Sequence, residues 1–463
     1  MPNARCRMPR ASCFGHLAIN GGPVSYATVI VLAAAVAVQA PGGQPDWTAV
    51  QAEAVKTLQG YVRINTSNPP GDVTKAADFL AGVLQREGIG VKRFESGAGR
   101  VILLARLKGT GSGKAILLEN HMDVVPTDPS RWSRDPFGAE IADGRMWGRG
   151  TMDMKGIGVA QLYSFIMLKR LNVPLARDVL LMFVPDEEVG GTLGAKWMRE
   201  QHFDELDPEY VLDEGGFGSR DLFTPGKLVF GISVAEKKIL WLRLRAEGVA
   251  GHGSQPIPQN PNDHLIRALG RLLNDPIPAA RFRVVETMKT RVGALADNKF
   301  NNAIQTSTMS ITSLRSGVGE PPKVNVIPSV AEALLDCRVL PGMTAQQWVA
   351  EVTRRVDDPS IKIDVTYESD DPVVTPDDTP FYRALESAVK RHHPDAIVTP
   401  MVVPYGTDAN GFRPKGVKSY GFFPGIVPAA SILSMHGDAE FIPTDALGPA
   451  IQILFEALRE TAR

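Results

Sequence analysis

Cysteine is scarce in this chain of 463 residues, which contains three: Cys6, Cys13 and Cys337. Cys6 and Cys13 lie in an N-terminal segment that we expect to be removed, so Cys337 would be alone in the mature chain and could form no internal disulfide. The same scarcity excludes a metal site built from several thiolates. Any metal ion is therefore expected to be held by His, Asp and Glu side chains, a donor set that suits zinc and manganese-like ions.

A surplus of charge of either sign is also lacking, since 50 basic and 51 acidic residues give a formal net charge of −1. Proteins that bind nucleic acid by neutralising phosphates need a basic surplus, so the composition argues against a nucleic-acid partner. Hydrophobic residues make up 44% of the chain, which is ample for a packed core and too many for a disordered chain. At this length we expect two or three domains.

Hydrophobic runs long enough to span a bilayer are lacking after the first forty residues. Residues 1–40 begin with several arginines, continue with an apolar run from Tyr26 to Val38, and end in small residues that fit a cleavage site. This pattern predicts a signal peptide over residues 1–40, and hence a secreted or periplasmic protein with no stable membrane insertion after cleavage. The alternative is an uncleaved membrane anchor, although the apolar run is short for a span.

Hydrophobic periodicity predicts an α/β domain in the next part of the chain. Helical spacing alternates with short apolar runs typical of strands, and the clearest of these runs are 101–107, 115–119, 179–184 and 210–212. Strands that alternate with helices indicate a sheet covered by helices on both faces.

The pattern changes after Gly231. Residues 238–247 alternate between apolar and charged side chains, which is typical of a half-exposed antiparallel strand, and residues 262–273 predict an amphipathic helix. We therefore expect an inserted α+β domain over residues 235–341, with two helices on one face of an antiparallel sheet. A helix at 344–356 and a strand at 361–367 would then belong to the segment 342–463, which returns to the first domain.

Side chains that can bind metals follow three of the apolar runs, and the carboxyl ends of strands are where open α/β sheets build their sites. The side chains concerned are His121, Asp123, Glu187, Glu188 and Glu214. Each motif has a plainer interpretation when it is taken alone: a surface histidine at 121, or a solvated acidic turn at 186–188. These plainer interpretations do not explain why metal-binding side chains follow three separate strands.

The glycine-rich segment 148–156 lies between these motifs and carries Asp153. We interpret Asp153 as the ligand shared by two metal ions, with the other groups gathered around it. The adjacent carboxylates at 186–188 would be costly at a buried strand end unless a cation compensates them. Asp123, two residues from His121, can hold the second ring nitrogen of that histidine. Asp213 adjoins Glu214, and either of the two could be a ligand.

Motifs of one metallopeptidase family occur in order along nearly all of the chain after the signal. They are His121-Met122-Asp123-Val124-Val125-Pro126, Gly148-Arg149-Gly150, Asp153-Met154-Lys155-Gly156, Pro185-Asp186-Glu187-Glu188-Val189-Gly190-Gly191, Leu212-Asp213-Glu214-Gly215, Gly251-His252-Gly253-Ser254, Asn325-Val326-Ile327-Pro328, Asp336-Cys337-Arg338 and Met435-His436-Gly437. On these motifs the chain resembles the aminoacylase, glutamate carboxypeptidase and succinyl-diaminopimelate desuccinylase family of two-zinc metallopeptidases.

The resemblance implies a zinc-peptidase-like catalytic domain with a central mixed sheet, formed by residues 45–234 and 342–463. It implies a lid or dimerisation domain with a four-stranded antiparallel sheet and two helices over residues 235–341. It further implies two Zn²⁺ ions, with Co²⁺ or Mn²⁺ as possible replacements, and a possible homodimer through the lid domain. The metal ligands that it implies are His121, Asp153, Glu188, Glu214 and His436, with Asp153 bridging both ions.

The same resemblance implies the remaining roles. Glu187 would be the general base, taking a proton from a water held by both metals and passing it to the departing amine. Asp123 would orient His121, and His252 would stabilise the reacting carbonyl of a partner subunit. Residues expected to contact substrate are Asn325, Arg338, Gly406 and Thr407. For Arg338 the alternative is an ion pair with Asp336, and for His252 it is a capped turn.

The function that follows is metal-dependent hydrolysis of the amide bond next to a free-carboxylate residue, as in a carboxypeptidase or dipeptidase. The alternative is an N-acyl-amino-acid hydrolase, and in either case the partner is a small peptide or an N-acyl amino acid. The reverse reaction, in which an acyl group is condensed with an amino acid, needs the same residues. A catalytically inactive binding protein would be expected to lose the base or a ligand, and a two-metal phosphoesterase would be richer in Asp and His.

Overall fold

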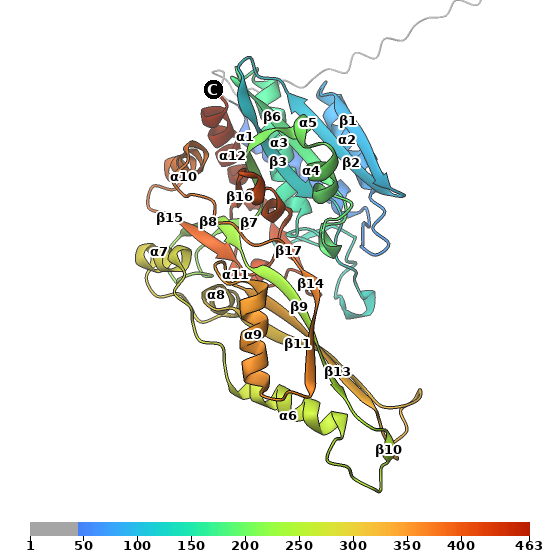
Figure 1. Cartoon of the computed structure of the whole chain (residues 1–463). Helices are drawn as coiled ribbons and strands as arrows, with labels where there is room; N and C mark the ends of the chain where they lie inside the picture. Colours follow the sequence, from blue (N-terminus) through green and yellow to red (C-terminus); the bar gives the residue numbers. More distant parts are fainter. Residues whose placement is uncertain (1–44) are drawn as a thin grey trace, which may run out of the picture. The chain divides into compact units, whose positions relative to one another are not determined.

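The computed structural model describes residues 45–463 (Figure 1). The expected signal peptide at residues 1–40 lies outside this range, so secretion stays a prediction of the sequence. Within the described range, no helix has the length and hydrophobicity needed to cross a membrane.

The larger sheet has eight strands and is mixed, as the fold class predicted. Its order is β1 (Val91–Gly97), β2 (Arg100–Leu107), β6 (Arg177–Val184), β3 (Gly113–His121), β7 (Pro208–Ser219), β16 (Lys418–Ile426), β8 (Val229–Glu236) and β15 (Ile397–Val403). β6, β3, β7 and β16 are parallel neighbours, so their carboxyl ends meet along one edge of the sheet. This edge is where the metal-binding motifs lie.

Helices cover both faces of the larger sheet. On one face of β6, Leu180 and Met182 pack with Met198 of α4 (Ala195–Gln201). Val179 and Leu181 alternate with them, so they point to the other face, and they are equally buried. The elements packed against the second face include α3 (Lys155–Arg170), which in turn contacts α1 (Trp47–Val62) and α12 (Leu447–Thr461). α2 (Thr74–Arg86) packs on β1 and β2, and α10 (Pro380–His392) packs on α12. This double coverage explains why the strands have near-continuous apolar sequences.

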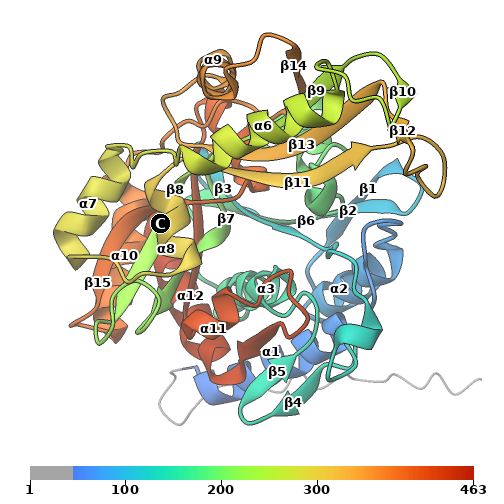
Figure 2. The same cartoon turned by 90° about the horizontal axis from the view of Figure 1, so that it is seen from below.

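The smaller sheet is antiparallel and four-stranded, which confirms the second half of the fold prediction. Its order is β11 (Thr308–Ser316), β13 (Val330–Val339), β9 (Lys238–Glu247) and β14 (Ile361–Glu368). Burial alternates along β9, as the apolar-charged pattern predicted. α6 (Pro261–Asn274) and α9 (Ala345–Val356) pack against the buried face, and Figure 2 shows α6 lying along it.

The smaller sheet reaches beyond the boundary at residue 341 that the sequence analysis sets. β14 hydrogen-bonds along β9, and α9 supplies Trp348 and Val352 to the same buried cluster. Sequence periodicity finds both elements but does not say which sheet they join, because strand pairing is a long-range property. Conversely, α7 (Arg283–Val292) lies within the expected inserted domain and packs on β15 of the larger sheet.

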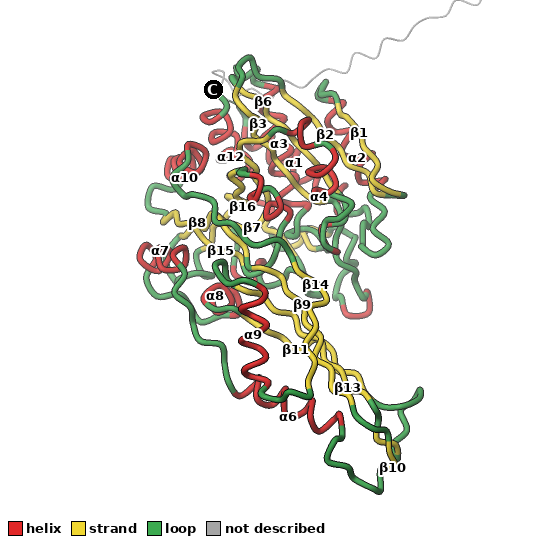
Figure 3. The backbone as a smooth tube through the Cα atoms, viewed as in Figure 1, coloured by secondary structure: helices red, strands yellow, loops and turns green. Residues whose placement is uncertain are grey.

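Shorter elements complete the described chain. α8 (Lys299–Gln305) is anchored by Asn301, whose Nδ2 donates to the carbonyls of Leu222 and Ala296. α5 (Phe203–Leu206) and α11 (Ala429–Ile432) are single turns, and β4 (Glu140–Ala142), β5 (Arg145–Trp147) and β17 (Phe441–Pro443) form a small sheet. β10 (Gly251–His252) pairs with β12 (Val326–Ile327), and Figure 3 places β10 at one end of the four-stranded sheet.

Candidate metal centre

The metal-binding motifs meet at the carboxyl edge of the parallel strands. His121 is the last residue of β3 and pairs with Val184 of β6, after which the chain turns through Glu187 and Glu188. Glu214 lies on the next strand, β7, within its carboxyl half. Parallel pairing therefore brings together side chains that are nearly a hundred positions apart in the sequence.

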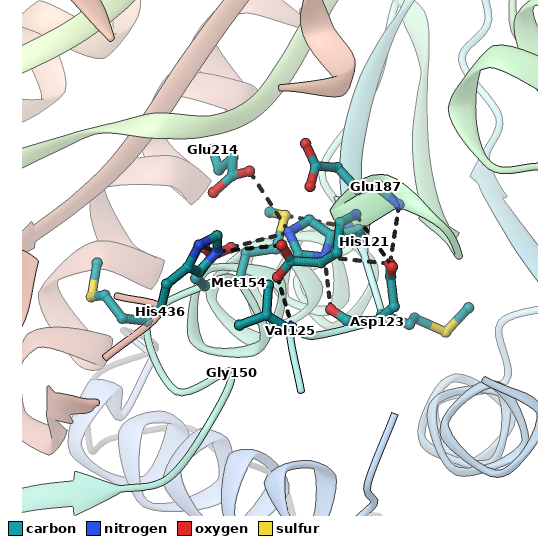
Figure 4. A network of polar contacts seen from close by, with 12 residues as sticks. His121, Asp123, Val125, Gly150, Met154, Glu187, Glu214 and His436 are labelled. Carbon is teal, nitrogen blue, oxygen red and sulfur yellow. Dashed lines mark hydrogen bonds and ion pairs between the residues drawn. The ribbon is translucent and has the colours of Figure 1, made fainter. Parts of the chain in front are cut away.

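Asp153 lies between two histidines, His121 and His436, both of which are labelled in Figure 4. Its Oδ1 is 3.2 Å from Nε2 of His121, and its Oδ2 is 3.1 Å from Nε2 of His436. Each histidine faces one further carboxylate: Glu214 Oε1 is 3.7 Å from His121 Nε2, and Glu188 Oε2 is 3.3 Å from His436 Nε2. The arrangement is two histidine-carboxylate pairs joined by the two oxygens of one aspartate.

The ring of His121 is held so that Nε2 can be a ligand. Its Nδ1 lies 2.9 Å from the backbone carbonyl oxygen of Asp123, whereas the Asp123 carboxylate is more distant, at 3.7 Å. A carbonyl can only accept a hydrogen bond, so Nδ1 carries a proton, and the lone pair of Nε2 is available to a cation held together with Asp153 and Glu214. Asp123 thus orients His121 mainly through its main chain.

The carboxylate of Asp123 holds the turn that carries the two glutamates. It accepts hydrogen bonds from the backbone N–H groups of Glu187 (3.2 Å) and Glu188 (3.3 Å), and from Nδ2 of Asn68 (2.9 Å). Asp186 begins this turn with φ 79°, and its Oδ2 accepts from the Leu193 N–H at 3.0 Å. Asn68 was not predicted from the sequence, because its position in the loop after α1 gives no sign of this contact.

The glycine-rich segment is anchored by a second residue that the sequence analysis missed, Glu440. This fully buried carboxylate accepts from the backbone N–H groups of Gly150, Met152 and Asp153, and from Nη1 of Arg149 at 2.8 Å. Gly150 has φ 84°, and a methyl group there would lie 2.7 Å from Val124. The loop that presents Asp153 therefore depends on a residue near the end of the chain.

The side chains of Asp213 and Glu214 point in different directions, and only that of Glu214 faces the centre. The Asp213 carboxylate accepts from the N–H groups of Glu214 (2.7 Å) and Ala409 (2.8 Å), so it is already bound to backbone. Glu214 points instead towards His121, and its Oε1 is 3.7 Å from Nε2 of that histidine. Successive strand residues face opposite sides, so only one of the two can reach the centre.

The donor set fits divalent cations. Ligand atoms of His121, Glu187 and Glu214 lie within 4.8 Å of one another, as do those of His121, Asp153 and Glu188. Burial raises the pKa of Glu187 well above its usual range, and burial together with the Asp153 carboxylate raises that of Glu214 to about 8. So many buried carboxylates repel one another, and bound cations would offset that cost. Imidazole nitrogens and carboxylate oxygens are typical zinc ligands.

A cavity of about 360 Å³ opens onto this centre. On the side of the metal centre it is lined by Asp153, Glu187, Glu188, Glu214 and His436. The remaining wall is largely apolar and carries two cations; it consists of Lys299, Phe300, Ala303, Arg338, Pro404, Tyr405, Gly406, Ile432, Leu433 and Met435.

Two of the four expected substrate contacts, Arg338 and Gly406, line the cavity, and Thr407 lies beside it. The Arg338 guanidinium also forms the alternative ion pair with Asp336, at 2.8 and 3.0 Å. Thr407 is buried, and its N–H and hydroxyl donate to Glu236, which fixes the loop that bears Gly406.

His252 and Asn325 are not brought to the cavity. They lie together at the β10–β12 ribbon, where the Gly253 N–H donates to the Asn325 carbonyl at 2.8 Å. Both side chains are exposed.

Comparison with known proteins gives a consistent result. The profile of Peptidase family M20/M25/M40 matches residues 117–460. Aminoacylase-1 of Sus scrofa is 30% identical over 379 residues, covering 80% of this chain and 86% of that protein. A probable carboxypeptidase S-like 2 of Dictyostelium discoideum is 27% identical over 380 residues, covering 76% and 72%.

Solved structures share the fold. An M20 family metallo-carboxypeptidase from Sulfolobus solfataricus aligns with a TM-score of 0.68 and 21% identity, covering 88% of this chain and 98% of that one. Human carnosine dipeptidase 1 aligns with a TM-score of 0.68 and 18% identity, covering 90% and 98%. The fold class and the family resemblance predicted from the sequence are thus confirmed, and the chain belongs to peptidase family M20/M25/M40 and is a hydrolase.

Proposed function

We propose that this protein is a two-metal hydrolase that cleaves the amide bond next to a residue with a free carboxylate. The observation that carries the proposal is the position of Asp153, whose two oxygens face two histidines that are each next to a further carboxylate. His121, Asp153 and Glu214 would hold one ion, and His436, Asp153 and Glu188 the other. A Bacillus subtilis structure of this fold is described as a dinuclear metal binding peptidase.

Two bound divalent cations would lower the pKa of a water molecule between them and polarise the substrate carbonyl. We propose zinc because the ligands are imidazole and carboxylate, although cobalt or manganese would suit the same set. Glu187 lines the cavity beside the proposed ligands, and it is our candidate for the general base. Its carboxylate could take a proton from that water and pass it to the departing amine.

Substrate orientation would come from the wall opposite the metals. Arg338, from β13, is suited to a terminal carboxylate because its guanidinium presents several donors in one plane. Gly406 has no side chain, so a substrate could approach the backbone of its loop, which Glu236 holds through Thr407. The apolar residues of the wall favour a substrate with an uncharged aliphatic or aromatic group.

N-acyl-amino-acid hydrolysis is the second candidate, and the same residues would carry it out. It is favoured by the 30% identity with aminoacylase-1, a relative that the chain matches over most of its length. We propose in addition that the enzyme is a homodimer, because His252 would act on a carbonyl at the centre and does not line the cavity of its own subunit.

A hydrolysis screen tests the proposal. The full chain is assayed on dipeptides and on N-acyl amino acids, before and after removal of metal with a chelator, and again after zinc is restored. We expect hydrolysis of at least one class, its loss on chelation, and its recovery with zinc. Activity that survives complete metal removal, or no hydrolysis of either class by the zinc-loaded protein, would contradict the proposal.

A further inference from the structure

Lys237 is a buried cation between β8 and β9, where the chain passes from the larger sheet to the smaller one. Its side chain is 1% exposed, and its Nζ donates to the carbonyl of Ala303 (2.9 Å) and to Oγ1 of Thr308 (3.0 Å). Both acceptors are neutral, and in the described part of the chain no carboxylate lies within ion-pair distance of Lys237. The next residue differs: Lys238 pairs with Glu368 and Asp371, each at 2.7 Å.

Lys237 lies next to Arg338. Thr308, which accepts the hydrogen bond from Lys237, is the direct partner of Arg338 in the pairing of β11 with β13. The side chains of Thr308 and Arg338 therefore project from the same face of the sheet. The Ala303 carbonyl belongs to α8, whose Ala303 side chain lines the cavity beside Arg338. Burial and then the positive charge of Arg338 lower the pKa of Lys237 to about 7.

The Arg338–Asp336 pair has little net charge, because the Asp336 carboxylate binds the guanidinium through two hydrogen bonds. A neutral pair can still orient a carboxylate through the remaining N–H groups, but it attracts the negative charge only weakly. When Lys237 is protonated, its unpaired charge, buried behind the pair, is screened far less than a charge in water would be. Arg338 and Lys237 therefore have separable tasks: Arg338 orients the carboxylate, and Lys237 attracts its charge.

We propose that Lys237 adds net positive charge to the subsite that binds the substrate carboxylate, acting as a positioning residue behind Arg338. The inference rests on the proposed function and adds to it the residue that makes the enzyme prefer free acids. Lys237 does not contact the substrate; it sets the electrostatic potential at the carboxylate and fixes the end of α8.

The test compares a free-acid substrate with its own C-terminal amide. The probes are N-acetyl-leucine and Ala-Leu, whichever the wild-type enzyme hydrolyses, and the corresponding amides. Below pH 7, where Lys237 is charged, we expect Lys237→Met to raise KM for the acid about tenfold or more while KM for the amide and kcat for both change little. Lys237→Gln, which keeps a hydrogen-bond donor without the charge, should behave in the same way. Lys238→Met is the matched control and should keep the preference for the acid.

The wild-type enzyme offers a measurement that needs no variant. The charged groups that face Lys237 are Arg338 and Asp336, both on β13, whereas its contacts on α8 and β11 are neutral. Lys237 is charged below a pKa of about 7 and neutral above it. The ratio of KM for the acid to KM for the amide should therefore rise as the pH rises through this range, and titrations at the metal centre affect both substrates and cancel.

The outcomes separate the inference from the proposed function. Equal changes in KM for acid and amide in the Lys237 variants, or a pH-independent KM ratio, would show that Lys237 is structural and overturn the inference alone. A zinc-loaded wild-type enzyme that hydrolyses neither probe nor its amide would overturn the proposed function and the inference with it.

Discussion

Glu187 and Glu188 are neighbours in one turn, yet their side chains have different surroundings. Glu188 accepts from the Val125 N–H at 3.2 Å and faces His436 at 3.3 Å, as a held ligand would. Glu187 lines the cavity, and no hydrogen bond to its carboxylate is found among the described residues. A carboxylate that stays free of partners can exchange a proton with a substrate, and one that is held cannot do so as readily.

We therefore expect Glu187→Gln to retain both metal ions and to lower kcat by about 10²- to 10⁴-fold, the usual contribution of a general base. Metal content per subunit and kcat, measured on the same preparation, check this. Glu188→Gln is the matched control and should lose bound metal. Because Glu187 also lies within 4.8 Å of ligand atoms of His121 and Glu214, metal loss from Glu187→Gln would reassign it as a ligand.

Single residues also show how far the sequence predicts this site. Asp153, Glu188 and His436 were predicted because each occurs in a distinctive motif, and the structure brings them within ion-pair distance. Asp213 and Glu214 could not be separated, because adjacent letters do not reveal which face of a strand each occupies. Glu440 gave no signal at all, since its contact with the Asp153 N–H spans 287 positions.

At the scale of elements, the glycine-rich loop before α3 is held by one buried carboxylate. Glu440 accepts four hydrogen bonds there, three of them from backbone N–H groups. Such a loop has little structure of its own, so its shape depends on this acceptor. The position of Asp153, and hence of both proposed metals, depends on it in turn.

Glu440→Gln should accordingly lower the free energy of unfolding by about 3–5 kcal/mol, because it leaves the Arg149 guanidinium charged and buried without its partner. It should also weaken metal binding. Denaturant unfolding of the metal-free protein and a metal titration measure the two effects separately. The control is Asp438, which lies two residues before Glu440 and forms an exposed ion pair with Arg131. Asp438→Asn should lower the free energy of unfolding by no more than about 1 kcal/mol. Equal stability of both variants would contradict the argument.

The elements themselves were predicted where periodicity is strong. Burial alternates along β9 because α6 and α9 cover one face of its sheet. β6 is buried along nearly all of its length because both faces of its sheet are covered. The sequence does not reveal that β14 joins the smaller sheet or that α9 packs against it. Both depend on the pairing of β14 with β9, which lies more than a hundred positions earlier in the chain. Local sequence determines an element, and distant pairing determines its place.

At the scale of the whole molecule, one expected catalytic residue lies away from the centre. His252 is exposed at the β10–β12 ribbon, and its Nδ1 accepts a hydrogen bond from the Ser254 N–H at 3.1 Å. Its Nε2 therefore carries the proton and can donate to an acceptor outside its own subunit. A donor of this kind stabilises negative charge that develops on a carbonyl oxygen, so the proposed dimer would complete each site with the partner's histidine.

Mixing two inactive variants tests this arrangement. His252→Ala and Asp153→Ala should each be inactive alone, whereas subunits of the two recombined in equal amounts should regain about one quarter of wild-type activity. Half of the dimers are then mixed, and one of the two sites in each has an intact Asp153 facing an intact His252 from the partner. The control recombines wild-type subunits with the double variant His252→Ala/Asp153→Ala. Its mixed dimers have no complete site, so all of its activity must come from wild-type dimers. Recovery that fails in the first mixture while both variants fold and dimerise would show that His252 does not act across subunits.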